Sequence, residues 1–144
     1  MAKREIDDRF KKFGTVSFTS ISKVNDFVDN LEKGKVMATR CPDCNISYFP
    51  PRIDCQKCLG NNNEWFDTTE KTGTLLTFSK MQYGPVGFEN DLPYTIAVLG
   101  FDDFKMFGRI DKDVPDDAIK IGMQMKVYAN DIQEDQKNFV FKPV

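Results

Sequence analysis

The sequence predicts a mainly β protein with N-terminal helices, a metal-stapled module and a small barrel. Three observations support this fold class: an apolar stripe at helical spacing, a C-x2-C-x10-C-x2-C array that follows it, and five strand-like segments after the array. With 144 residues, the chain is long enough for one ordinary domain or two small ones that share a core. We divide it into a helical segment (1–34), a cysteine module (35–66) and a barrel (67–144).

The helical segment is predicted from apolar residues that recur every three or four positions. They are Phe18, Ile21, Val24, Phe27, Val28 and Leu31. Thr19 or Ser20 is a candidate cap at the start of this helix, and Gly34 stands where a helix commonly ends. A shorter helix is expected from Arg4 to Phe13. Such a stripe is typical of core packing, and docking against a partner protein is the alternative.

The cysteine module contains all four cysteines of the chain, Cys41, Cys44, Cys55 and Cys58. Each C-x2-C pair brings two thiolates to one side of a tight turn, and together they supply the four soft ligands of a tetrahedral Zn²⁺. The spacing therefore predicts a zinc ribbon. A four-cysteine site leaves no open position for substrate or water, so we expect a structural metal rather than a catalytic one.

Two other uses of cysteine compete with zinc binding. Disulfides suit secreted domains, but the first residues show no apolar run typical of a signal peptide, and no stretch reaches the roughly 18 apolar residues of a membrane span. We therefore expect a cytoplasmic protein with reduced thiols. A thioredoxin-like role needs one C-x2-C motif on a strand-to-helix turn rather than two paired motifs.

The C-terminal part reads as five strands, several of which alternate apolar and polar residues. They are expected at Gly73–Gln82, Tyr94–Phe101, Phe104–Ile110, Met123–Ala129 and Asn138–Lys142. Asp102-Asp103 suggests a hairpin turn, and Pro115–Ala118 a second turn. Between the cysteine pairs, Ile46–Phe49 is predicted as a short strand stopped by two prolines. Five short strands favour an OB-fold barrel.

Further motifs accompany the two cysteine pairs. They are Tyr48-Phe49-Pro50-Pro51-Arg52 between the pairs, and then Glu64-Trp65, Gly73–Ser79, Leu92-Pro93-Tyr94 and Ile121-Gly122-Met123. In their residues and their order along the chain, these motifs resemble the DUF35 family of acyl-CoA-associated, thiolase-partner proteins. The family usually has glycine directly after each pair, where this chain has Asn45 and Leu59. Asparagine tolerates a left-handed backbone, leucine less so, and a shifted turn at Gly60 is one solution.

This resemblance implies a rubredoxin-like zinc ribbon followed by an OB-fold, and a non-catalytic accessory role. In archaeal-type mevalonate synthesis such a protein bridges acetoacetyl-CoA thiolase and hydroxymethylglutaryl-CoA synthase, so that acetoacetyl-CoA passes directly between them. Coenzyme A is then a possible ligand beside zinc. Its phosphates require Lys or Arg, and its arm requires a narrow apolar slot. The candidate contacts are Arg52, Lys80, Phe88 and Arg109, each of which has solvated surface or packing as its alternative.

The segment from Tyr83 to Pro93 is long for a connection within a small barrel and carries several apolar side chains. It is interpreted as a lid, as a docking patch for a partner, or as a plug folded into the core. The aromatic content of the chain, with 13 phenylalanines, favours the docking patch.

Two other functions compete with the scaffold. Zinc ribbons and OB-folds both bind single-stranded nucleic acid, but residues 67–144 carry 9 basic and 13 acidic side chains, and an acidic surface repels phosphate. An independent enzyme lacks candidates for its chemistry, since the chain has no histidine, no cysteine outside the metal array and no Gly-rich phosphate loop.

Overall fold

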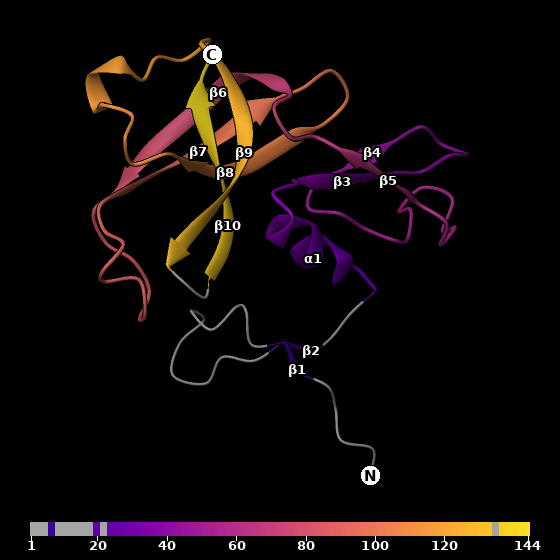
Figure 1. The fold of residues 1–144 in the computed structure, drawn as a ribbon. Helices are drawn as coiled ribbons and strands as arrows, with labels where there is room; N and C mark the ends of the chain where they lie inside the picture. The colour runs from indigo at the N-terminus through magenta and orange to yellow at the C-terminus, as the bar shows by residue number, and fades with distance from the viewer. Residues whose placement is uncertain (1–5, 8–18, 21–22, 134–135) are drawn as a thin grey trace.

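The computed structural model describes residues 6–7, 19–20, 23–133 and 136–144 (Figure 1). Within them the chain is mainly β, with one short α-helix. A closed barrel and a small three-stranded sheet lie side by side, and the helix lies beside both (Figure 1). A further two-stranded ladder joins β1 (Ile6–Asp7) to β2 (Thr19–Ser20).

The helix α1 spans Asp26–Glu32 and is shorter than the apolar stripe predicted. Thr19 and Ser20 do not cap it, because they form β2, and its N-cap position is taken by Asn25 without a side-chain hydrogen bond. Its end is as expected, with Gly34 at a φ of 78°. Val28 and Leu31 are buried, which confirms core packing for this part of the stripe.

The remaining N-terminal expectations are only partly within the described residues. Phe18 and Ile21 lie outside them, as does most of the helix expected from Arg4 to Phe13. Where that stretch is described, Ile6 and Asp7 form a strand, so a helix through these two residues is wrong. Strand pairing with β2 supplies the backbone hydrogen bonds that a helix would have supplied.

The cysteine module is a three-stranded antiparallel sheet in the order β4-β3-β5. Its strands are β3 (Met37–Arg40), β4 (Ser47–Tyr48) and β5 (Glu64–Asp67). β4 confirms the strand expected between the cysteine pairs. The central strand β3 pairs with β5 along its whole length, and Ala38 and Thr39 on it are fully buried.

The barrel contains the five predicted strands in the order β10-β8-β7-β6-β9. They are β6 (Thr72–Met81), β7 (Tyr94–Gly100), β8 (Lys105–Ile110), β9 (Gln124–Gln133) and β10 (Gln136–Pro143). The turn expected at Pro115–Ala118 contains a short 3-10 helix, Asp116–Ala118. The barrel is closed by a parallel contact between β10 and β8, and by antiparallel pairing of β6 with β9.

Closure of the barrel requires a glycine on β8. A Cβ atom at Gly108 would lie 2.6 Å from the ring of Phe139 and 2.7 Å from that of Phe141, both on β10. Because these rings fill the space beneath β8, only a residue without a side chain fits there. The core formed in this way also includes Leu31 and Val36, which precede the barrel in the sequence.

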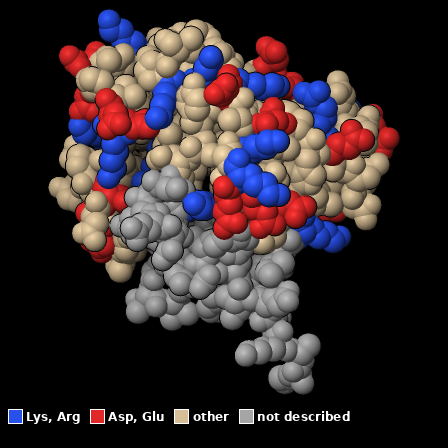
Figure 2. All heavy atoms as spheres, viewed as in Figure 1, with Lys and Arg blue, Asp and Glu red and all other residues tan. Residues whose placement is uncertain are grey.

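On the face drawn in Figure 2, basic and acidic side chains are interspersed over the described part of the molecule. No helix in the described part of the chain has the length and apolar character needed to cross a membrane.

Candidate functional site

The two cysteine pairs form backbone turns with matching hydrogen bonds. In the first, the Asn45 amide donates to the Cys41 carbonyl at 2.8 Å, and in the second the Leu59 amide donates to the Cys55 carbonyl at 2.9 Å. Each first cysteine also donates its own amide to a carbonyl farther along the turn, of Ile46 or Gly60. The two halves of the site are therefore built alike.

Both turns place a non-glycine residue in the left-handed region. Asn45 has a φ of 56° and Leu59 a φ of 59°. A shifted turn at Gly60 was one expected solution, and the structure does not use it: Leu59 itself adopts the left-handed conformation, and Gly60 is not among the positive-φ glycines. The Leu59 side chain is 82% exposed, so no packing offsets the strain.

The four sulfur atoms converge. All lie within 4.8 Å of one another, and Cys41 Sγ lies 3.6 Å from Cys58 Sγ. None is in a disulfide. A tetrahedral Zn²⁺ with Zn–S bonds of about 2.3 Å holds its sulfurs roughly 3.8 Å apart, which fits this cluster. The cluster and its zinc-ribbon fold support a structural zinc, and we propose the four cysteines as its ligands.

Hydrogen bonds to the sulfurs surround the cluster. The Cys44 amide donates to Cys41 Sγ and the Lys57 amide to Cys55 Sγ, each at 3.4 Å. A side chain adds a third contact, because the buried Tyr48 hydroxyl lies 3.3 Å from Cys55 Sγ. Such contacts orient metal ligands and stabilise their thiolate form.

The thiols differ in their acidity. Desolvation, followed by contacts with the neighbouring sulfurs, raises the pKa of Cys44 to about 12. The hydrogen bond with Tyr48, together with backbone amides, lowers the pKa of Cys55 to about 6. Four thiolates at this separation repel one another, so they do not ionise together unless a cation is shared among them. A divalent metal supplies that charge.

Three of the four residues predicted to contact CoA gather on one side of the barrel. Arg109 of β8 lies over the ring of Tyr94 at 3.9 Å and over that of Phe88 at 5.6 Å. Its guanidinium also pairs with Asp91 at 3.7 Å. Lys80 of β6 pairs with Asp116, close to the same group.

Arg52 is not part of this group. It lies in the zinc ribbon, where its guanidinium is 5.7 Å from the ring of Tyr48 and donates to Gln56 at 3.4 Å. Its carbonyl accepts hydrogen bonds from Thr39 and Asn63. These contacts are those of a residue that braces the ribbon.

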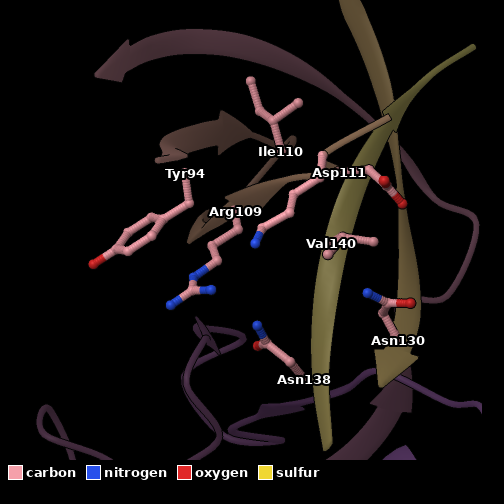
Figure 3. A pocket seen from close by; sticks show the side chains of 8 residues that line it. Tyr94, Arg109, Ile110, Asp111, Asn130, Asn138 and Val140 are labelled. Carbon is pink, nitrogen blue, oxygen red and sulfur yellow. The ribbon is translucent and has the colours of Figure 1, made fainter. Parts of the chain in front are cut away.

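Two pockets adjoin on this side of the barrel, and Arg109 lines the first. The first has a volume of about 140 Å³ and lies between β8, β9 and β10 (Figure 3). The second, about 270 Å³, includes Lys80 and Asp116. The pockets share Tyr94, Ile110 and the Asp111-Lys112 turn as a common wall.

The outer face of β6, β7 and β8 includes an apolar patch. Val98 of β7 lies opposite Phe107 of β8, and the Leu76 side chain of β6 covers Gly100 beside them. Phe107 is 60% exposed and Leu76 is 40% exposed. In the segment 83–93, Tyr83 and Val86 are also exposed, so these two side chains do not plug the core. Phe88 packs instead on Tyr94 and Arg109.

Comparison with known proteins identifies both modules. Residues 29–64 match the model of the ChsH2 rubredoxin-like zinc ribbon domain, and residues 68–130 match that of the ChsH2 C-terminal OB-fold domain. A DUF35 domain-containing scaffold protein of Methanocaldococcus jannaschii is 30% identical over 120 residues, which are 78% of this chain and 84% of the relative. The chain belongs to the DUF35 family.

Other relatives of this DUF35 protein agree. A DUF35 domain-containing scaffold protein of Pyrococcus furiosus is 28% identical over 103 residues, covering 72% of this chain and 74% of the relative. Among solved structures, one described as the Ltp2-ChsH2(DUF35) aldolase has a TM-score of 0.70 at 20% identity, over 87% of this chain and 98% of that one. A DUF35 protein of unknown function from Sulfolobus solfataricus has a TM-score of 0.54 at 15% identity, over 81% of this chain and 82% of that one. These structural likenesses show the shared fold.

Sequence reasoning missed the partners of the predicted residues. The role of Tyr48 beside the cysteines is not among the sequence-based predictions, although its place seven residues before Cys55 in a short strand is a usable signal. Asp91, which pairs with Arg109, lies in the 83–93 segment, where sequence gives no sign of this contact. Nothing in the local sequence of Lys112 and Asn138, which line the first pocket, distinguishes them from surface residues.

Proposed function

We propose that this DUF35 protein is a non-catalytic scaffold that bridges acetoacetyl-CoA thiolase and hydroxymethylglutaryl-CoA synthase in mevalonate synthesis, and that it contacts CoA through the group around Arg109. The observation that carries the non-catalytic role is the metal centre: four cysteines close the coordination sphere, and the sequence has no histidine to serve as a base. The curated relatives carry the name scaffold protein.

A scaffold needs a surface for its partners, and we assign this role to the outer face of β6, β7 and β8. Leu76 and Phe107 give it the apolar character of an interface core, and the exposed Tyr83 and Val86 add apolar surface in the segment that follows β6. A solved relative of the same fold is described as an assembly of Ltp2 with ChsH2, an aldolase, which supports a role beside an enzyme of another chain. Bridging favours flux because thiolase condensation is unfavourable and the next reaction removes its product.

The test combines the zinc-loaded full chain with purified thiolase and synthase from its own organism. Size-exclusion chromatography with light scattering should show the two enzymes in one particle only when this chain is present. Phe107→Glu should release at least one enzyme, whereas Ile121→Glu, also at an exposed apolar residue, should not. Independent elution of all three proteins contradicts the scaffold, and a salt-sensitive complex with a single-stranded oligonucleotide supports the nucleic-acid alternative instead.

A further inference from the structure

We propose that the pocket between β8, β9 and β10 is a phosphate-binding site, in which Arg109 and Lys112 supply the charge and Asn138 supplies an amide. The inference deepens the proposed CoA contact and rests on it for the natural ligand, whereas the phosphate site itself rests on the residues of the pocket. The chemical class is a phosphate monoester or diphosphate, either free or as part of a larger molecule such as CoA.

The pocket has the size and lining for such a group. Its volume of about 140 Å³ is many times the roughly 10–15 Å³ that admits one water molecule. Figure 3 shows Arg109 and Asn138 extending toward one another from β8 and β10, with Tyr94 beside the guanidinium. Both strands belong to the closed barrel, so these donors are held by a rigid element.

Arg109 is fixed in position before any ligand arrives. Only 15% of its side chain is exposed, and its guanidinium is stacked on Tyr94 and contacts Phe88. Asp91 pairs with it through one nitrogen, NH1, at 3.7 Å. A guanidinium has five N–H donors, so others remain for a phosphate. Preorganisation of this kind reduces the entropy lost on binding.

Lys112 adds a second positive charge to the same wall. No ion pair links Lys112 to any carboxylate within the described part of the chain. Because Asp91 balances the charge of Arg109, the positive charge left at the pocket is that of Lys112, and it favours an anion over a neutral ligand.

The carboxylates near the pocket are already engaged. Asp111 pairs with Lys142 at 3.1 Å and accepts the Asp113 amide at 3.0 Å. Figure 3 shows its carboxylate directed away from Arg109. Asp91 is balanced by Arg109 itself. The charge of Lys112 therefore remains available to a ligand.

The second pocket gives the ligand room to continue. It adjoins the first along Tyr94 and Lys112, has a volume of about 270 Å³, and is lined in part by Leu92, Pro93 and Val114. A phosphate in the first pocket can thus carry a longer, partly apolar group into the second. This combination matches a phosphate-bearing molecule with an extended arm, as CoA has.

Isothermal titration calorimetry on the zinc-loaded full chain tests the site with three probes: inorganic pyrophosphate, CoA and pantetheine, which lacks phosphate. Pyrophosphate and CoA should bind, and pantetheine should bind far more weakly. Equal affinities for the first two assign the pocket to phosphate alone, and an affinity for CoA about tenfold higher assigns it to CoA, with the second pocket occupied. No heat with either phosphate compound up to millimolar concentration overturns the proposal.

Matched variants locate the binding. Lys112→Gln should weaken pyrophosphate binding about tenfold, the effect expected for one charge-assisted hydrogen bond, and Lys112→Arg should retain it. Lys105→Gln, which removes an exposed lysine on β8 outside the pocket, should leave it unchanged. If Lys112→Gln binds pyrophosphate with unchanged affinity, the phosphate lies elsewhere and the assignment is wrong. Because these titrations contain no partner enzyme, failure to assemble thiolase and synthase would reject the scaffold and leave the phosphate site standing.

Discussion

The ring of Phe49 meets the ring of Phe139 edge-on, with centroids 5.2 Å apart and planes at 88°. Phe49 follows β4 in the zinc ribbon, and Phe139 lies on β10 of the barrel. Phe27 of α1 contacts both rings, at 5.9 Å and 6.4 Å. One aromatic cluster therefore joins the helix, the ribbon and the barrel, and we expect the zinc centre and the barrel to unfold together.

Phe139→Ala should reduce the free energy of unfolding by about 2 kcal/mol, somewhat less than for a fully buried phenylalanine because this ring is only partly buried. Urea unfolding followed by Trp65 fluorescence reports the ribbon, and circular dichroism reports mainly the barrel. Both transitions should shift by the same amount. Phe107→Ala removes an exposed ring and should cost under about 0.5 kcal/mol. A shift in the barrel signal without one at Trp65 would show that the modules unfold independently.

Leu59→Gly should stabilise the zinc-loaded protein by about 0.5–1 kcal/mol, because glycine adopts the φ of 59° without a Cβ clash. The opposing term is the greater freedom of glycine in the unfolded chain, which limits the gain. Leu59→Ala is the matched control, since it removes the exposed side chain and keeps the Cβ atom. Thermal unfolding at saturating zinc measures both. If alanine stabilises as much as glycine does, side-chain exposure rather than backbone conformation is responsible.

Much of the fold could be predicted from local sequence patterns. The predictions that failed did so for identifiable physical reasons. The five barrel strands were predicted within a few residues because segments such as Met123–Ala129 alternate strictly and turn residues separate them. The strands β3 and β5 were missed because they are short and are stabilised by pairing with each other rather than by their own pattern. The predicted helix was too long because its stripe continued through residues that pair as β2.

The candidate site shows the same division. The cysteine cluster was predictable because its ligands are paired closely in sequence and metal chemistry dictates their spacing. The surroundings of Arg109 were not, since Asp91 comes from a loop 18 residues earlier and Asn138 from a strand 29 residues later. Pairing of β7 with β8 brings the loop that carries Asp91 beside Arg109, and barrel closure brings β10 with Asn138 to the same place. Both depend on the register between strands, which local sequence does not reveal.

Tyr48→Phe should weaken zinc binding about tenfold without unfolding the protein. The Tyr48 hydroxyl accepts the Gln56 amide at 3.2 Å, so its own hydrogen is available to Cys55 Sγ at 3.3 Å. Without this hydroxyl the thiolate loses a donor and protons compete better with the metal. Competition with a chromogenic chelator measures the affinity. Tyr83→Phe, at an exposed tyrosine, is the control. Equal zinc affinities in the two variants would show that backbone amides alone orient Cys55.

Asp111→Asn should destabilise the protein by on the order of 1 kcal/mol near neutral pH and have little effect in acid. Burial opposes ionisation of Asp111, but the Asp113 amide and the Lys142 ammonium outweigh it and lower its pKa below 3.8. A lowered pKa gives stability that is present above the unfolded-chain value and is lost as the pH falls through the folded value. The measurement is urea unfolding across this range, compared with Asp102→Asn at an exposed carboxyl. Zinc release in acid affects both variants alike, so the difference between their free energies of unfolding reports Asp111. If this difference does not shrink in acid, the charge of Asp111 is not what stabilises this turn.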